Sequence, residues 1–177
     1  MLAQPGPLPR GHGWAFELKL DGFRALVDTH DGLRVLSRRG WNMTDRLPEL
    51  SALPEGLILD GELVAWGEDD LPSWPQLGHR VLHGRQGIAI TLFVFDVLRV
   101  EGDDTMCLPY MERRTILEVL ELPGVARVID SSMPGSGTGR QPLSRPASPD
   151  ARTDTTGTRR RDATARRRCH SDRSLQN

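Results

Sequence analysis

Lys19 is the only lysine in a chain of 177 residues whose other 22 basic residues are all arginine. An arginine guanidinium stays protonated and cannot act as a nucleophile, whereas a lysine amine can lose its proton when its surroundings favour that. Arginine-rich coding explains much of the imbalance as a compositional bias, yet a lysine retained against it can have a role that arginine cannot fill. The first candidate chemistry is therefore nucleophilic attack by an amine.

Lys19 begins a motif of the form K-x-D-G-x-R that ends at Arg24. In this spacing Gly22 lets the backbone turn beside a phosphate, and the arginine can hold an anion through two hydrogen bonds. The alternative is an exposed strand end, where a lysine between the carboxylates of Glu17 and Asp21 is ordinary surface composition. By itself the hexapeptide is a moderate indication of phosphate chemistry.

Strand patterns surround the motif and must position it. Residues 14–21 alternate strictly between apolar and charged or small side chains, which predicts a half-buried strand with Phe16, Leu18 and Leu20 on its buried face. Asp31-Gly32 is a strong hairpin signal. Strands are predicted, in chain order after the first, at residues 24–29, 33–37, 57–66, 90–98 and 125–129.

Three helices are expected, at residues 46–53, 73–82 and 110–122. The first must place Pro48 in its first turn, the second has Ser73 as N-cap, and Pro123-Gly124 stops the third. The predicted fold class is therefore α+β, an antiparallel sheet with helices on the outside.

Charge and aromatic content divide the chain near residue 130. Residues 1–130 carry 13 basic and 20 acidic side chains and all nine aromatics, whereas residues 131–177 carry 10 basic and 4 acidic ones. A segment so poor in apolar side chains cannot offset its ordering entropy, so 131–177 is expected to be a disordered tail rich in Arg, Pro, Ser and Thr. Two interpretations of it stay open: a basic nucleic-acid-binding tail, or a terminus translated in a shifted reading frame.

No apolar run approaches the roughly 20 residues that span a bilayer, and the N-terminus lacks a charged segment followed by an apolar one. We therefore expect neither a membrane protein nor an exported one, and a cytoplasmic location.

Five stretches of the sequence resemble, in order and spacing, the nucleotidyltransferase domain of ATP-dependent DNA ligases, most closely the bacterial non-homologous end-joining type. They are FELKLDGFRAL, VLSRRGWNMTDRLPEL, LILDGELVAW, FVFDVL and YMERRTILEVLEL. The resemblance covers residues 1 to about 130. It implies the antiparallel-sheet, ATP-grasp-like nucleotidyltransferase fold of the ligase adenylation domain, incomplete at its C-terminal side.

The resemblance also implies the chemistry of the first motif. Lys19 would attack the α-phosphate of ATP, expel pyrophosphate and become a lysyl-AMP. Glu17 matches the family acid two residues before the nucleophile, adjacent to the nucleotide. Arg24 matches the arginine that approaches the ribose and the phosphate on the DNA side.

Three later residues acquire roles in the same way. Arg38 corresponds to the second-motif arginine near the ribose, Glu62 to the acid that helps hold Mg²⁺ (or Mn²⁺) and the ribose, and Phe95 to the aromatic that stacks on adenine. Without the resemblance, Glu62 would be interpreted as the polar face of a hairpin and Phe95 as core. The implied partners are nicked or broken double-stranded DNA and a Ku-type end-binding protein, with the chain a monomer.

The match has gaps that bear on activity. The family's fourth motif, EGxxxK, and its fifth, KxK, do not occur in the chain, and neither does the OB-fold domain. We therefore expect weak or absent nick sealing. Two alternatives stay open: an RNA ligase or capping-type nucleotidyltransferase, and a non-catalytic remnant that binds nucleic acid.

Overall fold

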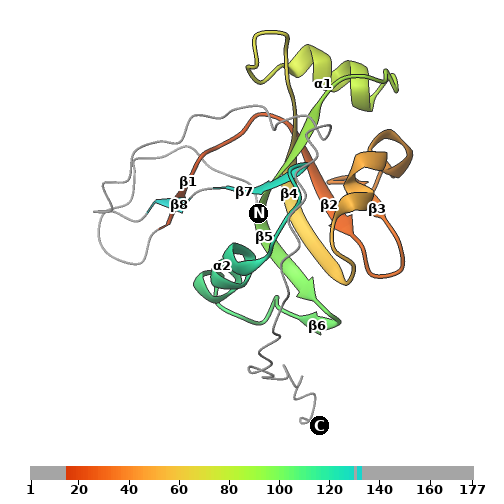
Figure 1. Ribbon diagram of the computed structural model, residues 1–177. Coiled ribbons are helices and arrows are strands. Elements are labelled where there is room, and N and C mark those ends of the chain that lie inside the picture. Colours follow the sequence, from red (N-terminus) through yellow and green to blue (C-terminus); the bar gives the residue numbers. More distant parts are fainter. Residues whose placement is uncertain (1–14, 130, 133–177) are drawn as a thin grey trace, which may run out of the picture.

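The computed structural model describes residues 15–129 and 131–132, and its centre is a six-stranded sheet (Figure 1). The strands of this sheet are β2 (Phe23–Asp28), β3 (Arg34–Ser37), β4 (Leu57–Ala65), β5 (Ile90–Val100), β6 (Asp103–Asp104) and β7 (Ala126–Val128). Their order is β3-β2-β4-β5-β6, with β7 also paired to β5. All neighbours are antiparallel except β5 and β7, so the expected α+β class with a mainly antiparallel sheet is confirmed.

One face of the sheet carries the main hydrophobic core. Side chains alternate between the two faces of a strand, so Val27, Leu59 and Val94 share a buried face with their cross-strand neighbours. The helices α1 (Trp74–Val81) and α2 (Tyr110–Val119) add Leu77 and Leu117 to this core. The opposite face is left for polar side chains and a small apolar cluster of Val64, Trp66, Phe93 and Ile129.

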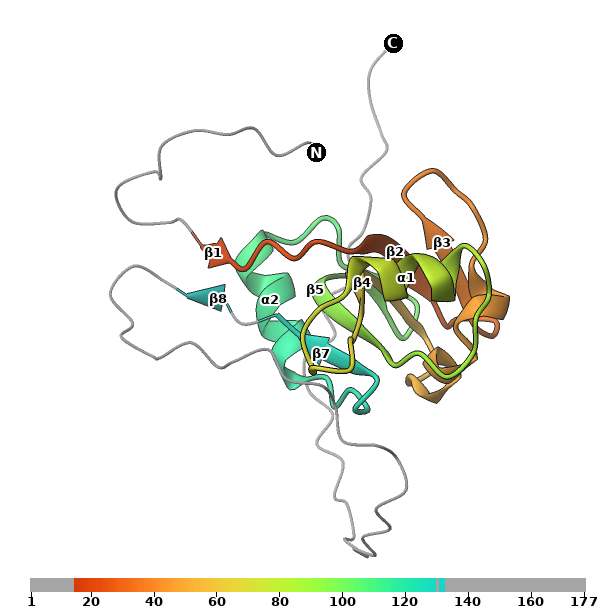
Figure 2. The same ribbon diagram turned by 90° about the horizontal axis from the view of Figure 1, so that it is seen from above.

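The segment before the sheet differs from the prediction. Instead of a strand over 14–21, only β1 (Phe16–Glu17) is a strand, paired with β8 (Ser131–Ser132). Alternation makes a strand only where a partner supplies hydrogen bonds, and within the described residues only Phe16 and Glu17 have a strand partner in this segment. Leu18, predicted to be buried, is 54% exposed, and residues 18–21 form an irregular link to β2. Figure 2 shows this link running between β1 and β2.

The helix predictions had mixed outcomes. Helix α1 begins after Ser73, whose hydroxyl accepts from the Gln76 amide at 3.5 Å, as predicted. The helix predicted at 46–53 is wrong: that region forms two short 3₁₀ turns, η1 (Thr44–Arg46) and η2 (Pro48–Ala52), separated at Leu47, with Pro48 opening the second. Helix α2 ends at Val119 rather than 122, because Leu120 is already extended.

The predicted hairpin at Asp31-Gly32 is confirmed by the antiparallel pairing of β2 with β3. The predicted tail and its disorder lie outside the described residues, apart from the two residues of β8. Among the residues described, neither helix has the length and apolar character needed to cross a membrane.

Candidate active site

The open face of the sheet brings Arg24 and Glu62 together. They are direct partners in the β2–β4 register, so their side chains leave the sheet on the same face. Asp60 precedes Glu62 by two residues and shares that face. Asp60-Gly61-Glu62 thus lies inside one continuous strand, within the predicted 57–66, and its two acidic side chains point away from the core.

A bulge in β5 adds Phe95 to this face. Asp60 pairs with Asp96 and Gly61 with Val94, which leaves Phe95 as an extra residue without a partner. An extra residue makes two successive side chains point the same way. Because Val94 and Val97 both lie in the core, Phe95 and Asp96 both face the polar side.

The Arg24 guanidinium links these groups. Its Nε and Nη2 donate to the two Asp60 carboxylate oxygens at 3.0 and 2.6 Å, and its Cζ lies 5.3 Å from the centroid of the Phe95 ring. The hydrogen bond to Asp60 raises the pKa of Arg24, so the group remains a cation under all ordinary conditions. A cation stacked on an aromatic face and still partly exposed can exchange its partner for an arriving phosphate.

Glu62 holds the turn that follows Lys19. Its Oε1 accepts from the Gly22 amide at 3.0 Å. Burial raises the pKa of Glu62, and the nearby carboxylates Asp21 and Asp60 act in the same direction, whereas the Gly22 hydrogen bond and Arg24 oppose the shift. A cation that binds beside this carboxylate would stabilise its ionised form.

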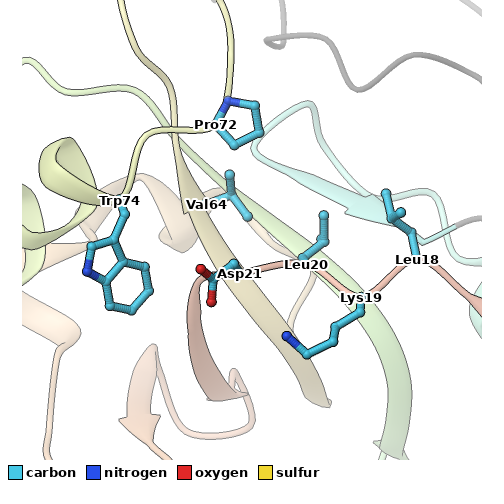
Figure 3. Close-up of a pocket in the computed structure, with 7 residues that line it drawn as sticks. All are labelled: Leu18, Lys19, Leu20, Asp21, Val64, Pro72 and Trp74. Carbon is cyan, nitrogen blue, oxygen red and sulfur yellow. The ribbon is translucent and has the colours of Figure 1, made fainter. Parts of the chain in front are cut away.

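Lys19 lies on the exposed link between β1 and β2. Figure 3 shows Leu18 and Leu20 pointing to one side of the link and Lys19 to the other. A pocket of about 270 Å³ adjoins it, and its walls come from the link, β4 and the start of α1. Its lining residues are Leu18, Lys19, Leu20, Asp21, Val64, Pro72 and Trp74. The amine is thus accessible to a ligand beside a partly apolar hollow.

Glu17 is not part of the cluster around Arg24. Its Oε1 accepts from the Tyr110 hydroxyl at 2.5 Å and lies 3.5 Å from Arg114 Nη1, so its carboxylate faces α2. The placement adjacent to the nucleotide that the resemblance implies for Glu17 stays a prediction.

Arg38 lies in the exposed turn after β3. The preceding residue, Ser37, pairs with Ala25, so Arg38 stands at the end of the sheet that carries Arg24. The structure places it near the site's edge, and no side-chain bond holds it in the part of the chain described.

Three residues of the site were missed by the sequence interpretation. Asp60 holds Arg24, while Asp96 accepts two hydrogen bonds from Arg113, at 2.8 and 2.9 Å. A signal existed for both acids, since Asp60 shares its strand face with Glu62 and Asp96 follows Phe95 directly. Arg113 could not be found that way because its partner is 17 residues away.

The carboxylates of the site suit a metal ion that is held partly by the substrate's phosphates better than one that is held by protein ligands alone. No cluster of three or more His, Cys, Asp or Glu side chains able to hold a metal exists among the described residues. Mg²⁺ in nucleotide sites typically uses one or two carboxylates plus substrate phosphates and water. Glu62, half-buried and with one oxygen used by Gly22, can supply one such ligand.

Comparisons with known proteins show the family of the chain. Residues 2–131 match the model of the ATP dependent DNA ligase domain. The chain is 42% identical over 126 residues to the multifunctional non-homologous end joining protein LigD of Pseudomonas aeruginosa, covering 68% of this chain and 14% of that protein. It is 34% identical to LigD of Mycolicibacterium smegmatis, covering 77% of this chain and 18% of that protein.

Two solved structures share the fold. The ligase domain of LigD from M. tuberculosis matches with a TM-score of 0.57 and 30% identity, over 67% of this chain and 40% of that one. A mycobacterial DNA ligase D in complex with ATP and MES matches with a TM-score of 0.53 and 26% identity, over 66% and 39%. The chain thus spans less than a fifth of the length of the two LigD proteins, and it belongs to the ATP-dependent DNA ligase domain family.

Proposed function

We propose that this chain performs the first step of ATP-dependent DNA ligation, in which Lys19 takes AMP from ATP. The observation that carries the proposal is that the link bearing the only lysine is bonded, through the Gly22 amide, to Glu62 on a sheet face that also holds Arg24 and Phe95. Membership of the ligase family supports it, and so does a related ligase structure that contains ATP.

The reaction is a displacement at the α-phosphorus. A bond forms between Lys19 Nζ and that phosphorus, the bond to the bridging oxygen breaks, and pyrophosphate leaves with the electron pair. The amine must first give up a proton, because only the neutral form has a lone pair to donate. A bound Mg²⁺ or Mn²⁺ would neutralise charge on the triphosphate, with Glu62 as its protein ligand.

The neighbouring side chains have separate tasks in this proposal. Phe95 offers a π face on which adenine can stack. Arg24 can leave Asp60 to hold a phosphate or the ribose, because its guanidinium is partly exposed. Arg38 would approach the ribose from the turn after β3. Most of the rate enhancement in phosphoryl-type transfer comes from such positioning and charge stabilisation.

Later steps are proposed from the relatives. The adenylate would pass to the 5′-phosphate of nicked or broken double-stranded DNA, as part of end joining in the cytoplasm with a Ku-type end-binding protein, and the chain would act as a monomer. The names of the LigD relatives support end joining and disfavour the RNA ligase and capping alternatives.

Labelling with ATP tests the proposal. The protein is incubated with α-labelled ATP and Mg²⁺, denatured and separated by electrophoresis. We expect label on the wild type and none on Lys19→Arg, a matched control that keeps the positive charge but cannot attack. Label that survives in Lys19→Arg, or its absence from wild type at all ATP concentrations, would refute the proposal.

Addition of DNA extends the assay to the acceptor. Labelled protein is freed of ATP and mixed with nicked duplex DNA or with a matching nicked RNA. We expect the label to move to the 5′ end of DNA in preference to RNA. Transfer to RNA alone would contradict the DNA ligase assignment and leave the adenylation step standing.

A further inference from the structure

Two neighbouring arginines of helix α2 contact two different parts of the site. Arg113 donates twice to Asp96 and once to the Leu108 carbonyl, at 2.7 Å for the last. Arg114 lies instead against Glu17 of β1. Successive helix residues point about 100° apart, so one helix can reach both β5 and β1. Figure 2 shows α2 beside β1.

The contact with β1 is a network along one stripe of α2. Tyr110, Arg114 and Glu118 are spaced four residues apart and therefore lie on one side of the helix. Tyr110 and Arg114 both reach the same Glu17 oxygen, while Arg114 Nε donates to Glu118 at 3.0 Å and Nη2 donates to the Ile129 carbonyl. Helix α2 is thus bonded to β1 and to the chain that leads toward β8.

Burial makes the network depend on Glu17. The Arg114 side chain is only 4% exposed and has two carboxylate partners, Glu118 at its Nε (3.0 Å) and Glu17 at its Nη1 (3.5 Å). Its Nη1 has no hydrogen-bond partner among the described residues, so Glu17 supplies the counter-charge at that end of the guanidinium. A buried cation that loses a counter-ion is destabilised. Burial, and next the hydrogen bond to Glu17, raise the pKa of Tyr110 to about 12, so the phenol stays a donor at any assay pH.

Both ends of the link that carries Lys19 are therefore fixed. Glu17 holds its start against α2, and Gly22 holds its end against Glu62. Four residues separate these anchors, and Lys19 is the second of them. A span this short limits how far the backbone at Lys19 can move from where the anchors place it.

We infer that α2 is a positioning helix, in which Tyr110 and Arg114 place Lys19 and Arg113 places Phe95. The helix then sets the separation between the nucleophile and the base-stacking aromatic. This inference rests on the proposed function, and it gives Glu17 a positioning role in place of a nucleotide contact.

The kinetics of adenylate formation in variants at Tyr110 and at Arg113 test the inference. Tyr110→Phe removes one hydroxyl without changing shape, and Glu112→Gln on the exposed side of α2 is its matched control. A displaced nucleophile lowers the rate at saturating ATP without weakening ATP binding, so we expect Tyr110→Phe to slow adenylate formation at least about ten-fold with KM within about two-fold. Arg113→Lys should instead raise KM for ATP, because it disturbs the paired hydrogen bonds to Asp96, the residue that follows Phe95. A raised KM in Tyr110→Phe with an unchanged rate would overturn the inference.

Amide hydrogen exchange keeps the test independent of catalysis. In Tyr110→Phe we expect faster exchange at residues 18–22 while the amides of β4 stay protected, and Glu112→Gln should match the wild type. Because Lys19 is the sole lysine, its acylation by an amine reagent reports on the same link. Absence of label on wild type would count against the proposed function, whereas unchanged exchange and unchanged acylation in Tyr110→Phe would overturn the positioning role.

Discussion

Replacement of Gly22 by alanine tests the close approach between the Lys19 link and the sheet. A Cβ on Gly22 would lie 2.2 Å from the Leu63 carbonyl oxygen and 2.9 Å from Glu62 Cγ, whereas ordinary contacts begin at 3.4 Å. Strand β4 is bonded on both sides, by β2 and β5, so it cannot yield. The link must therefore move by about 1 Å, which would break the Gly22 to Glu62 hydrogen bond.

The expected loss follows from that displacement. A misplacement of about 1 Å can cost about 100-fold in rate, equivalent to about 2.7 kcal/mol of transition-state stabilisation. Overpacking should also lower the free energy of unfolding by about 1–3 kcal/mol. Single-turnover adenylate formation with α-labelled ATP measures the first quantity, and urea denaturation measures the second.

Gly78→Ala is the matched control for this substitution. Gly78 lies inside α1, and a Cβ there meets nothing within 4 Å. Alanine should keep the adenylation rate and raise stability by up to about 1 kcal/mol through helix propensity. If Gly22→Ala behaves like Gly78→Ala in both assays, the reasoning about the close approach is wrong.

Three further predictions concern titration and nucleotide binding. Because folding raises the pKa of Glu62, the free energy of unfolding should fall as the pH rises above 4.5, the ordinary pKa, and through the raised pKa of the folded state. Glu62→Gln should therefore have a higher Tm than wild type at pH 7. A difference in Tm that does not narrow toward pH 4 would count against this. Tyr110 is the only tyrosine, so ultraviolet titration should show it ionising near pH 12 in wild type and lower in Glu17→Ala; equal curves would contradict the contact. Phe95→Leu should raise KM for ATP about ten-fold through lost stacking, while Phe95→Tyr keeps it; equal KM values for both would remove the stacking role.

The sheet could be predicted from the sequence because its signals are local. Alternation, β-branched runs and the Asp31-Gly32 turn each act within a few residues, and they located the hairpin and the long strands, while Ser73 as N-cap located the start of α1. The first strand was overestimated because alternation says nothing about the length of the partner. The helix over 46–53 was overestimated because a proline compatible with a first turn does not distinguish an α-helix from a short 3₁₀ turn.

Part of the candidate site could be predicted from the sequence for the same reason. Arg24, Glu62 and Phe95 lie in short motifs, and strand register brings the three to one face. The contacts of α2 were not predictable, because Glu17 and Tyr110 are 93 residues apart and only the folded chain makes them neighbours. Sequence reasoning therefore found three residues that gather on the polar face of the sheet and missed the long-range contacts of α2.

A crystal structure of the protein with ATP and Mg²⁺ would show whether the Lys19 amine becomes joined to AMP. We expect Lys19 Nζ either bonded to the α-phosphorus or within about 3.5 Å of it and opposite the leaving pyrophosphate, with adenine against Phe95. A bound nucleotide whose α-phosphorus lies far from Nζ, with the amine directed into solvent, would contradict it.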